Sequence, residues 1–291
     1  MSVRIIPRLD IKGPNLVKGI HLEGLRVLGR PERFARHYYH QGADELLYMD
    51  VVASLYGRNS LLEIVERTSR EIFIPLTVGG GLRSLEDIRK VLRAGADKVS
   101  LNTAALQRPQ LIREAAQAFG SSTIVVSIEA IRKQDGSYEA YTDNGRQRTG
   151  IDALWWATKA AELGCGEILV TSIDREGTGK GFDLELTKAI AESVDVPVIA
   201  CGGAGQREDV AQVILEAKAD AVCVASILHY DAYPFLQGEG DFSSEGNREF
   251  LKRRSRFSKI EGTTLVWLKE FLSEQGIPVR PVQKEAAYAR G

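Results

Sequence analysis

The sequence predicts an α/β fold, namely a (β/α)8 barrel whose two halves resemble each other. Short runs rich in Val, Ile and Leu alternate with helix-like stretches, which is typical of βαβ units around a parallel sheet. Eight such runs fall within about 230 residues, which suits a closed barrel better than an open doubly wound sheet. We expect strands at residues 5–10, 45–50, 76–79, 98–102, 124–129, 167–172, 198–200 and 221–225. Helices are expected at 85–94, 109–119, 152–163 and 184–194, with a last helix at 263–275.

An internal repeat supports the closed barrel. Residues 74–81 (IPLTVGGG) resemble 196–203 (VPVIACGG), 96–99 (ADKV) resemble 219–222 (ADAV), and 44–50 parallel 166–174. The offset is about 122–124 residues each time, which corresponds to four strands and four helices. Two similar half-barrels that close into one barrel explain this offset.

Composition excludes several classes of protein. The chain has 291 residues, of which 44% are hydrophobic and 26% charged, so it can bury a sizeable core. Its 38 basic and 39 acidic residues leave a net charge of −1, so no overall field attracts it to nucleic acid or to an anionic membrane. We find no bilayer-spanning run, no signal peptide and no metal-like spacing of the three cysteines. We therefore expect a cytoplasmic protein without a metal ion or a cofactor.

We expect one barrel domain over residues 1–280, with an insertion at about 234–259 and a disordered tail at 281–291. The insertion is polar and Gly/Ser-rich, and then strongly basic. A flexible surface segment is the simpler interpretation, and docking of an acidic partner or a phosphate is the alternative. Residues 131–150 also depart from the βα pattern, and their Asp135-Gly136 pair predicts a β-hairpin after the fifth strand.

Glycines follow corresponding strands in the two halves. Gly79-Gly80-Gly81 comes directly after one strand and Gly202-Gly203 after its counterpart. Glycine lets the backbone approach a ligand closely, and a helix start offers free N–H groups to an anion. Small polar ends of the neighbouring strands complete two expected phosphate cradles: Gly80, Gly81, Asn102 and Thr103 in one, and Gly202, Gly203, Ala225 and Ser226 in the other. Two cradles indicate a substrate with a phosphate at each end, and a purely structural use of the glycines is the alternative.

Acidic residues mark the carboxyl ends of several strands, where catalytic groups of such barrels lie. Asp10 and Glu129 are four strands apart, so they are expected to face each other across the barrel mouth. Opposed carboxyl groups suit general acid–base catalysis, and burial on an apolar strand raises the pKa of a carboxyl group. Asp50 and Asp174 end two further strands, and Lys18 is placed to reach substrate or an acid. Salt-bridged rim residues and a solvent-exposed lysine are the alternatives.

The opposite end of the barrel carries charges as well. Arg4, Glu45, Lys98 and Glu167 stand at the first residue of their strands, so two positive and two negative charges are expected around the barrel bottom. Charge in a barrel core is costly unless it is paired. We consider two arrangements: a salt-bridged gate, or separate exposed charges.

Five motifs resemble the cyclase subunit of imidazole glycerol phosphate synthase, the HisF family, from about residue 4 to residue 279. They are 5–10 (IIPRLD), 16–19 (LVKG), 77–81 (TVGGG), 96–105 (ADKVSLNTAA) and 169–178 (LVTSIDREGT). The resemblance implies a two-fold repeated (β/α)8 TIM barrel that binds a substrate phosphorylated at both ends. It also implies a HisH-like glutaminase partner at the barrel bottom, whose ammonia enters there.

The implied reaction combines ammonia with a phosphoribulosyl-formimino aminoimidazole carboxamide nucleotide. It releases imidazole glycerol phosphate and an aminoimidazole carboxamide ribonucleotide. By this resemblance Asp10 and Glu129 form the acid–base pair, and Arg4, Glu45, Lys98 and Glu167 form the ammonia gate. Lys18, Asp50, Thr171 and Asp174 become supporting polar groups, and Gly177 joins the second cradle.

Three residues depart from the family pattern. Glu129 and Glu176 each stand where the family has Asp, and Arg8 replaces a small residue. By strand alternation Arg8 is expected to project into the barrel one layer below Asp10. There its charge is expected to pair with Glu129 and to depress the pKa of Glu129. Its side chain is also expected to narrow the ammonia path. These departures leave two alternatives: a paralogue that uses glutamine-derived ammonia to amidinate a bacterial surface sugar, or a barrel that docks a partner without catalysis.

Overall fold

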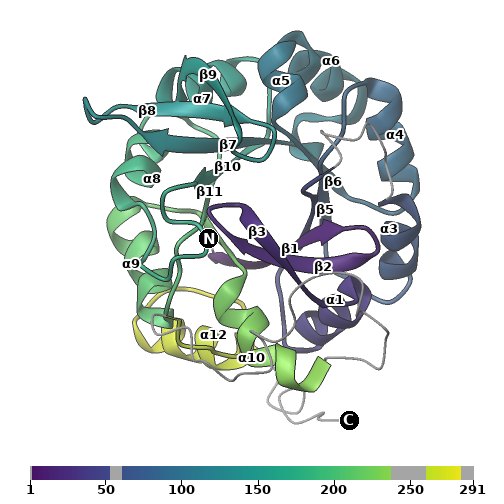
Figure 1. Ribbon diagram of the computed structural model, residues 1–291, viewed down its shortest axis with the longest axis vertical. Helices are drawn as coiled ribbons and strands as arrows, with labels where there is room; N and C mark the ends of the chain where they lie inside the picture. Colours follow the sequence, from purple (N-terminus) through teal and green to yellow (C-terminus); the bar gives the residue numbers. More distant parts are fainter. Residues whose placement is uncertain (1, 53–60, 237–259, 283–291) are drawn as a thin grey trace.

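Eight parallel strands form a closed barrel with the helices on its outside (Figure 1). The computed structural model describes residues 2–52, 61–236 and 260–282. The barrel strands, in order around the barrel, are β1 (Arg4–Lys12), β4 (Leu46–Asp50), β5 (Leu76–Gly79), β6 (Lys98–Leu101), β7 (Ile124–Arg132), β10 (Glu167–Ser172), β11 (Val198–Cys201) and β12 (Ala221–Val224). Parallel pairing of β12 with β1 closes the barrel. The predicted (β/α)8 TIM barrel and its eight strands are confirmed.

Helices follow the strands, as βαβ connectivity requires. They are α1 (Pro31–His40), α3 (Leu62–Ser69), α4 (Leu85–Arg93), α5 (Thr103–Gln107), α6 (Gln110–Phe119), α7 (Ala153–Glu162), α8 (Leu184–Ala191), α9 (Arg207–Ala217), α10 (Ser226–Leu236) and α12 (Leu265–Glu274), with a 3-10 turn η1 (Ser121–Thr123). The five predicted helices are confirmed with slightly shorter bounds. Helix α10 covers the first three residues of the expected insertion, and residues 237–259 and 283–291 lie outside the described residues.

The same pair of hydrogen bonds, between an aspartate and the start of a strand, recurs at the barrel bottom. The carboxylate of Asp97 accepts from the N–H of Leu76 over 2.8 Å, and the carboxylate of Asp220 accepts from the N–H of Val198 over 2.9 Å. Each aspartate also donates its own N–H back to the carbonyl of the same strand residue. In both halves, these hydrogen bonds thus connect the first residue of one strand to the residue that precedes the next strand, as expected from the internal repeat.

Two antiparallel hairpins extend the sheet. The predicted hairpin after the fifth barrel strand is confirmed: β7 pairs with β8 (Tyr138–Thr142), and β8 pairs with β9 (Gln147–Asp152). A second hairpin, β2 (Asn15–Ile20) and β3 (Glu23–Gly29), follows β1 and was not predicted. His21 and Leu22 turn this hairpin with φ values of 52° and 62°. Because neither is Gly, Asn or Asp, the usual hairpin signal is missing from the sequence.

The buried apolar residues form two layers. The larger cluster packs the outer faces of the strands against the helices. The smaller one fills the barrel itself and includes Ile6, Leu47, Val125, Leu169 and Ile199. Alternation along each strand therefore sends every second side chain into the barrel, where the candidate functional residues also lie.

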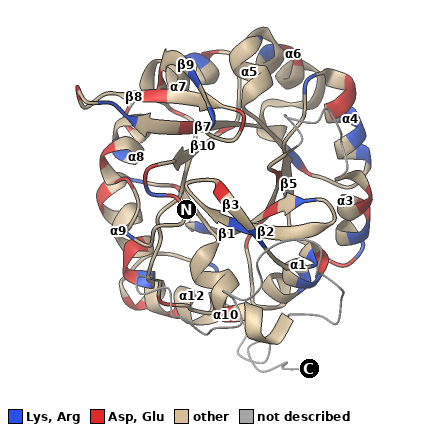
Figure 2. Ribbon diagram, in the orientation of Figure 1, with Lys and Arg blue, Asp and Glu red and all other residues tan. Residues whose placement is uncertain are grey.

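Charged residues of both signs are interleaved over the outer helices (Figure 2). Within the described residues, no helix combines the length and hydropathy of a membrane span.

Candidate active site

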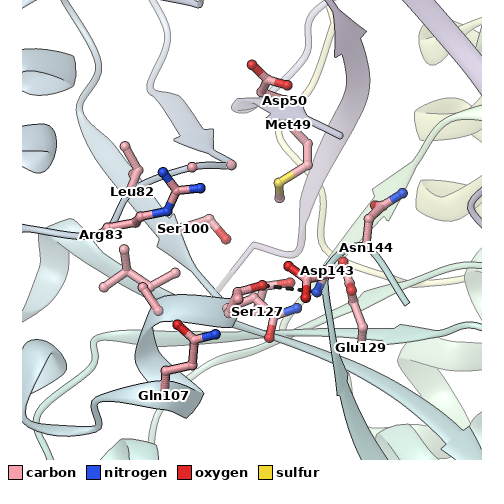
Figure 3. A pocket seen from close by; sticks show the side chains of 16 residues that line it. Met49, Asp50, Leu82, Arg83, Ser100, Gln107, Ser127, Glu129, Asp143 and Asn144 are labelled. Carbon is pink, nitrogen blue, oxygen red and sulfur yellow. Dashed lines mark hydrogen bonds between the residues drawn. The ribbon is translucent and has the colours of Figure 1, made fainter. Parts of the chain in front are cut away.

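A cavity of about 250 Å³ opens at the carboxyl ends of β4, β5, β6 and β7 (Figure 3). The four residues expected to form the first phosphate cradle all line it: Gly80, Gly81, Asn102 and Thr103. Asp50 and Glu129 line the same cavity. The structure thus brings one predicted cradle and two of the predicted acids to one side of the barrel mouth.

Gly80 keeps the floor of this cradle open. Its φ is +99°, and a Cβ at this position would collide with the backbone carbonyl of Asp50. Beside it, Asn102 donates to the Tyr141 carbonyl over 3.3 Å, while its buried Oδ1 has no hydrogen-bond partner. Thr103 accepts from the N–H of Asp143 over 3.0 Å. Only glycine fits at position 80, because the backbone there passes too close to the backbone of Asp50 for a side chain.

The second cradle surrounds a smaller cavity of about 20 Å³. The expected residues line it, namely Gly177, Gly202, Gly203, Ala225 and Ser226. This cavity lies at the ends of β11 and β12, across the barrel from β5 and β6. Because all eight strands are parallel, both cavities open on the same rim.

Arg8 pairs with Asp10, and this corrects the expectation that it pairs with Glu129. Its Nε donates to Asp10 Oδ1 over 2.7 Å, and its Nη1 reaches Thr171 Oγ1 at 3.4 Å and Cys201 Sγ at 3.6 Å. Burial is the largest single effect and works against the guanidinium charge, but Asp10, Cys201, Glu176 and Cys223 together outweigh it, so the pKa of Arg8 is raised well above its usual value. Arg8 does project into the barrel below the mouth, as the strand alternation predicts.

Glu129 is a buried acid that titrates near neutral pH. Burial raises its pKa from 4.5 to about 7, while the charge of Arg8 lowers it by less than burial raises it. Arg8 therefore does lower the pKa of Glu129, as expected, but burial raises this pKa by more and leaves it above its usual value. The Oε2 atom of Glu129 is buried without a hydrogen-bond partner. A carboxyl group in this state can give up or take a proton at physiological pH.

Lys18 is buried in an ion pair. Its Nζ lies 2.6 Å from Glu176 Oε1, and both side chains are almost fully buried. The N–H of His21 donates to the Glu176 carbonyl over 2.9 Å, so two contacts fasten the β2–β3 hairpin to the loop after β10. The alternative of a solvent-exposed lysine is wrong.

The remaining predicted acids differ in position. Asp50 lines the larger cavity, and its carboxylate accepts from the N–H of Val52 over 3.0 Å. Asp174 is exposed and lines neither cavity, and its carboxylate accepts from the N–H of Arg132 over 2.9 Å. The structure therefore does not bring Asp174 to the other candidate site residues.

Arg4, Glu45, Lys98 and Glu167 form a closed ring of ion pairs at the barrel bottom. Arg4 lies 2.8 Å from Glu45 and 2.9 Å from Glu167, while Lys98 lies 3.0 Å from Glu45 and 3.2 Å from Glu167. Each cation thus contacts both carboxylates, and separate exposed charges are ruled out. Above this charged ring lies an apolar void of about 10 Å³, lined by residues such as Ile6, Leu47 and Leu169.

Several lining residues of the larger cavity were missed by the sequence analysis. They are Arg83, Ser100, Gln107, Ser127 and Asn144, which are labelled in Figure 3. Ser100 and Ser127 stand two residues before Asn102 and Glu129, so strand alternation alone places them on the inward face. Both hydroxyls are buried without a hydrogen-bond partner, which makes the cavity floor polar. Among the described residues, no cluster of three or more His, Cys, Asp and Glu could hold a metal ion.

Comparisons with known proteins agree with this architecture. The family described as "Histidine biosynthesis protein" matches residues 4–234. A relative from Legionella pneumophila, named "Imidazole glycerol phosphate synthase subunit HisF", is 60% identical over 208 residues, which cover 72% of this chain and 98% of the relative. A relative of the same name from Alkaliphilus metalliredigens is 48% identical over 231 residues, covering 79% and 92% of the two chains. The chain therefore belongs to the histidine biosynthesis protein family.

Proposed function

We propose that this chain is an ammonia-dependent cyclase and lyase of the HisF type, acting in the cytoplasm. It converts the bis-phosphorylated phosphoribulosyl-formimino aminoimidazole carboxamide nucleotide to imidazole glycerol phosphate and an aminoimidazole carboxamide ribonucleotide. One observation carries the proposal: two glycine-lined cavities open on the same barrel rim, on opposite sides. A substrate with a phosphate at each end fits this arrangement, and the acids at the barrel mouth then face its middle.

Asp10 and Glu129 have different roles in this proposal. Glu129, with a pKa of about 7, holds a proton in a large share of molecules at neutral pH and acts as the general acid. Asp10 accepts a hydrogen bond from the Arg8 guanidinium over 2.7 Å and acts as the general base in this proposal. Thr171 and Lys18 position these groups, since Thr171 contacts Arg8 and Lys18 secures the hairpin over the mouth.

The ammonia comes from a HisH-like glutaminase that docks at the barrel bottom. The charged ring of Arg4, Glu45, Lys98 and Glu167 is the entry gate in this proposal. The apolar void of about 10 Å³ above it is close to the minimum that holds a water-sized molecule. From there the path to Glu129 passes the layer that contains Arg8, Ser100 and Ser127.

Complementation tests the proposal. A histidine auxotroph that lacks the cyclase but keeps the glutaminase is expected to grow without histidine when it expresses this chain. The Asp10→Asn variant is the matched control and is expected to fail. Failure of the wild-type chain, with the protein folded and abundant in the cells, contradicts the proposed reaction.

A second candidate is favoured by the Arg8–Asp10 ion pair. Asp10 is engaged by a buried cation, and Glu129 is one methylene longer than the family's aspartate. These two departures are the grounds for the alternative of a paralogue that delivers glutamine-derived ammonia to a different acceptor, namely a bacterial surface sugar that becomes amidinated. Ammonia-dependent turnover of such a sugar together with failed complementation supports this candidate over the first.

A further inference from the structure

Two cysteines lie side by side inside the barrel. Cys201 on β11 and Cys223 on β12 are direct partners in the register of two parallel strands. Both belong to the cluster that fills the barrel, so both side chains project to the same side of the sheet. Neighbouring strands lie about 4.7–4.9 Å apart, which is within the Cα separation of about 4.4–6.8 Å that a disulfide spans. Both thiols are free in this structure.

The surroundings of Cys201 favour its thiolate. A hydrogen bond from the Cys223 thiol lowers the pKa of Cys201 most, and the charge of Arg8 lowers it further, although burial and Glu176 oppose them. Arg8 Nη1 lies 3.6 Å from Cys201 Sγ. The groups that face this pair are thus one buried cation, Arg8, and two carboxylates, Asp10 and Glu176.

A small molecule has a route to the pair. Cys201 and Cys223 both line the cavity of about 20 Å³ at the second cradle. This cavity opens at the barrel rim, so a reagent of a few atoms that enters the second cradle can reach the sulfur atoms.

Cys165 provides an internal comparison. It is also buried and free, but burial raises the pKa of its thiol to about 12. A buried thiol of this kind is unreactive, whereas a thiolate beside a cation is nucleophilic.

We propose that Cys201 is a peroxide-reactive thiolate and that Cys223 is its resolving partner. The Cys201 sulfur attacks hydrogen peroxide, so an S–O bond forms, the O–O bond breaks, and the departing hydroxide takes a proton to become water. Cysteine 201 is now a sulfenic acid, and the peroxide has been reduced by two electrons. The Cys223 sulfur then attacks it, an S–S bond forms, the S–O bond breaks, and the second hydroxide leaves as water with the Cys223 proton.

The disulfide changes the barrel interior at two points. Cys201 Sγ moves away from Arg8 Nη1, which leaves the guanidinium with Asp10 and Thr171 as its hydrogen-bond partners among the contacts described above. The floor of the second cradle also contracts, because both sulfur atoms line its cavity. Oxidation is therefore expected to weaken anion binding at the second cradle, and reduction is expected to restore it.

Differential alkylation with mass spectrometry tests this proposal on the full chain. After peroxide treatment, alkylation of the unfolded protein is expected to modify Cys165 alone, and a reductant is expected to restore alkylation of Cys201 and Cys223. The intact mass is expected to fall by two hydrogen atoms. The Cys165→Ser variant is the control and is expected to form the same disulfide.

The Cys223→Ser variant tests the order of the two steps. It is expected to stop at the Cys201 sulfenic acid, which a dimedone probe labels, at least about tenfold faster than any label appears at Cys165. Equal oxidation of Cys165 and Cys201, or peroxide-treated wild-type protein without a Cys201–Cys223 linkage, overturns the proposal. These readouts are independent of turnover, so they separate this proposal from the proposed cyclase activity.

Discussion

The Nε atom of Arg8 donates to Asp10 Oδ1 over 2.7 Å in the interior of the barrel, and both side chains are at most 5% exposed. The two residues stand two positions apart on β1, so alternation sends them to the same face. This ion pair places a cation between the apolar void above the charged ring and the acids at the barrel mouth.

Removing Arg8 is expected to destabilise the protein strongly. In Arg8→Met, a buried carboxylate loses its partner, and the free energy of unfolding is expected to fall by about 3–5 kcal/mol. Urea unfolding measures this change, and a double-mutant cycle with Asp10→Asn isolates the coupling between the two residues. Arg36→Met removes an exposed ion pair with Glu71 and is expected to cost less than about 1 kcal/mol. Equal effects of the two substitutions contradict a buried pair.

Glu129 is expected to make stability depend on pH. Its pKa is raised from 4.5 to about 7 in the folded protein, so its contribution is fully present below pH 4.5 and is lost as the pH rises through 7. Relative to Glu129→Gln, the wild type is expected to lose about 3 kcal/mol of unfolding free energy between pH 4 and pH 8. Urea unfolding at several pH values checks this. An increase in relative stability over the same range contradicts the assignment.

Gly80→Ala is expected to damage the first cradle. Besides its φ of +99°, the added methyl collides with the Asp50 carbonyl, so the strand end must move and substrate affinity is expected to fall about tenfold or more. Gly120→Ala is the matched control, because Gly120 has a φ of +90° and open space around its Cβ position. Calorimetric titration with the bis-phosphorylated substrate measures both variants. An equal loss of affinity in both variants shows that backbone strain, and not the cradle, is responsible.

Lys98→Met is expected to affect ammonia delivery more than ammonia use. The substitution leaves Glu45 and Glu167 with Arg4 as their shared cation in the charged ring. With the glutaminase present, glutamine-dependent turnover is expected to fall several-fold further than turnover supported by ammonium salt. Lys159→Met, which removes an exposed pair with Glu162, is the control. A parallel loss of both activities in Lys98→Met contradicts a role in delivery.

The barrel was predictable because its eight strands are short apolar runs, because helix patterns follow five of them, and because the two halves of the sequence repeat. The β2–β3 hairpin was not predictable, because its turn residues His21 and Leu22 have left-handed backbone conformations that residues of these types rarely adopt. Gly80, Gly81, Gly202 and Gly203 were predicted to line the barrel mouth because their positions after corresponding strands repeat in the two halves, whereas Gly177 was added by the family resemblance alone.

The partner of Arg8 was not predictable from alternation alone. The pattern places Arg8 in the barrel but does not say whether the guanidinium crosses to Glu129 or turns back to Asp10 on its own strand. In the structure the same guanidinium also contacts Thr171 and Cys201, which lie 163 and 193 residues away in the sequence, so its surroundings could not be read from β1 alone. Lys18 raised the same difficulty, because its partner Glu176 lies 158 residues away.

Turnover by the purified chain tests the central claim most directly. Incubation with the bis-phosphorylated formimino nucleotide and ammonium salt, without any glutaminase, is expected to yield imidazole glycerol phosphate and the carboxamide ribonucleotide in equal amounts. Asp10→Asn is expected to bind the nucleotide and yield neither product. A folded wild-type chain that binds the nucleotide but leaves it unchanged, or an Asp10→Asn variant with substantial turnover, contradicts the account.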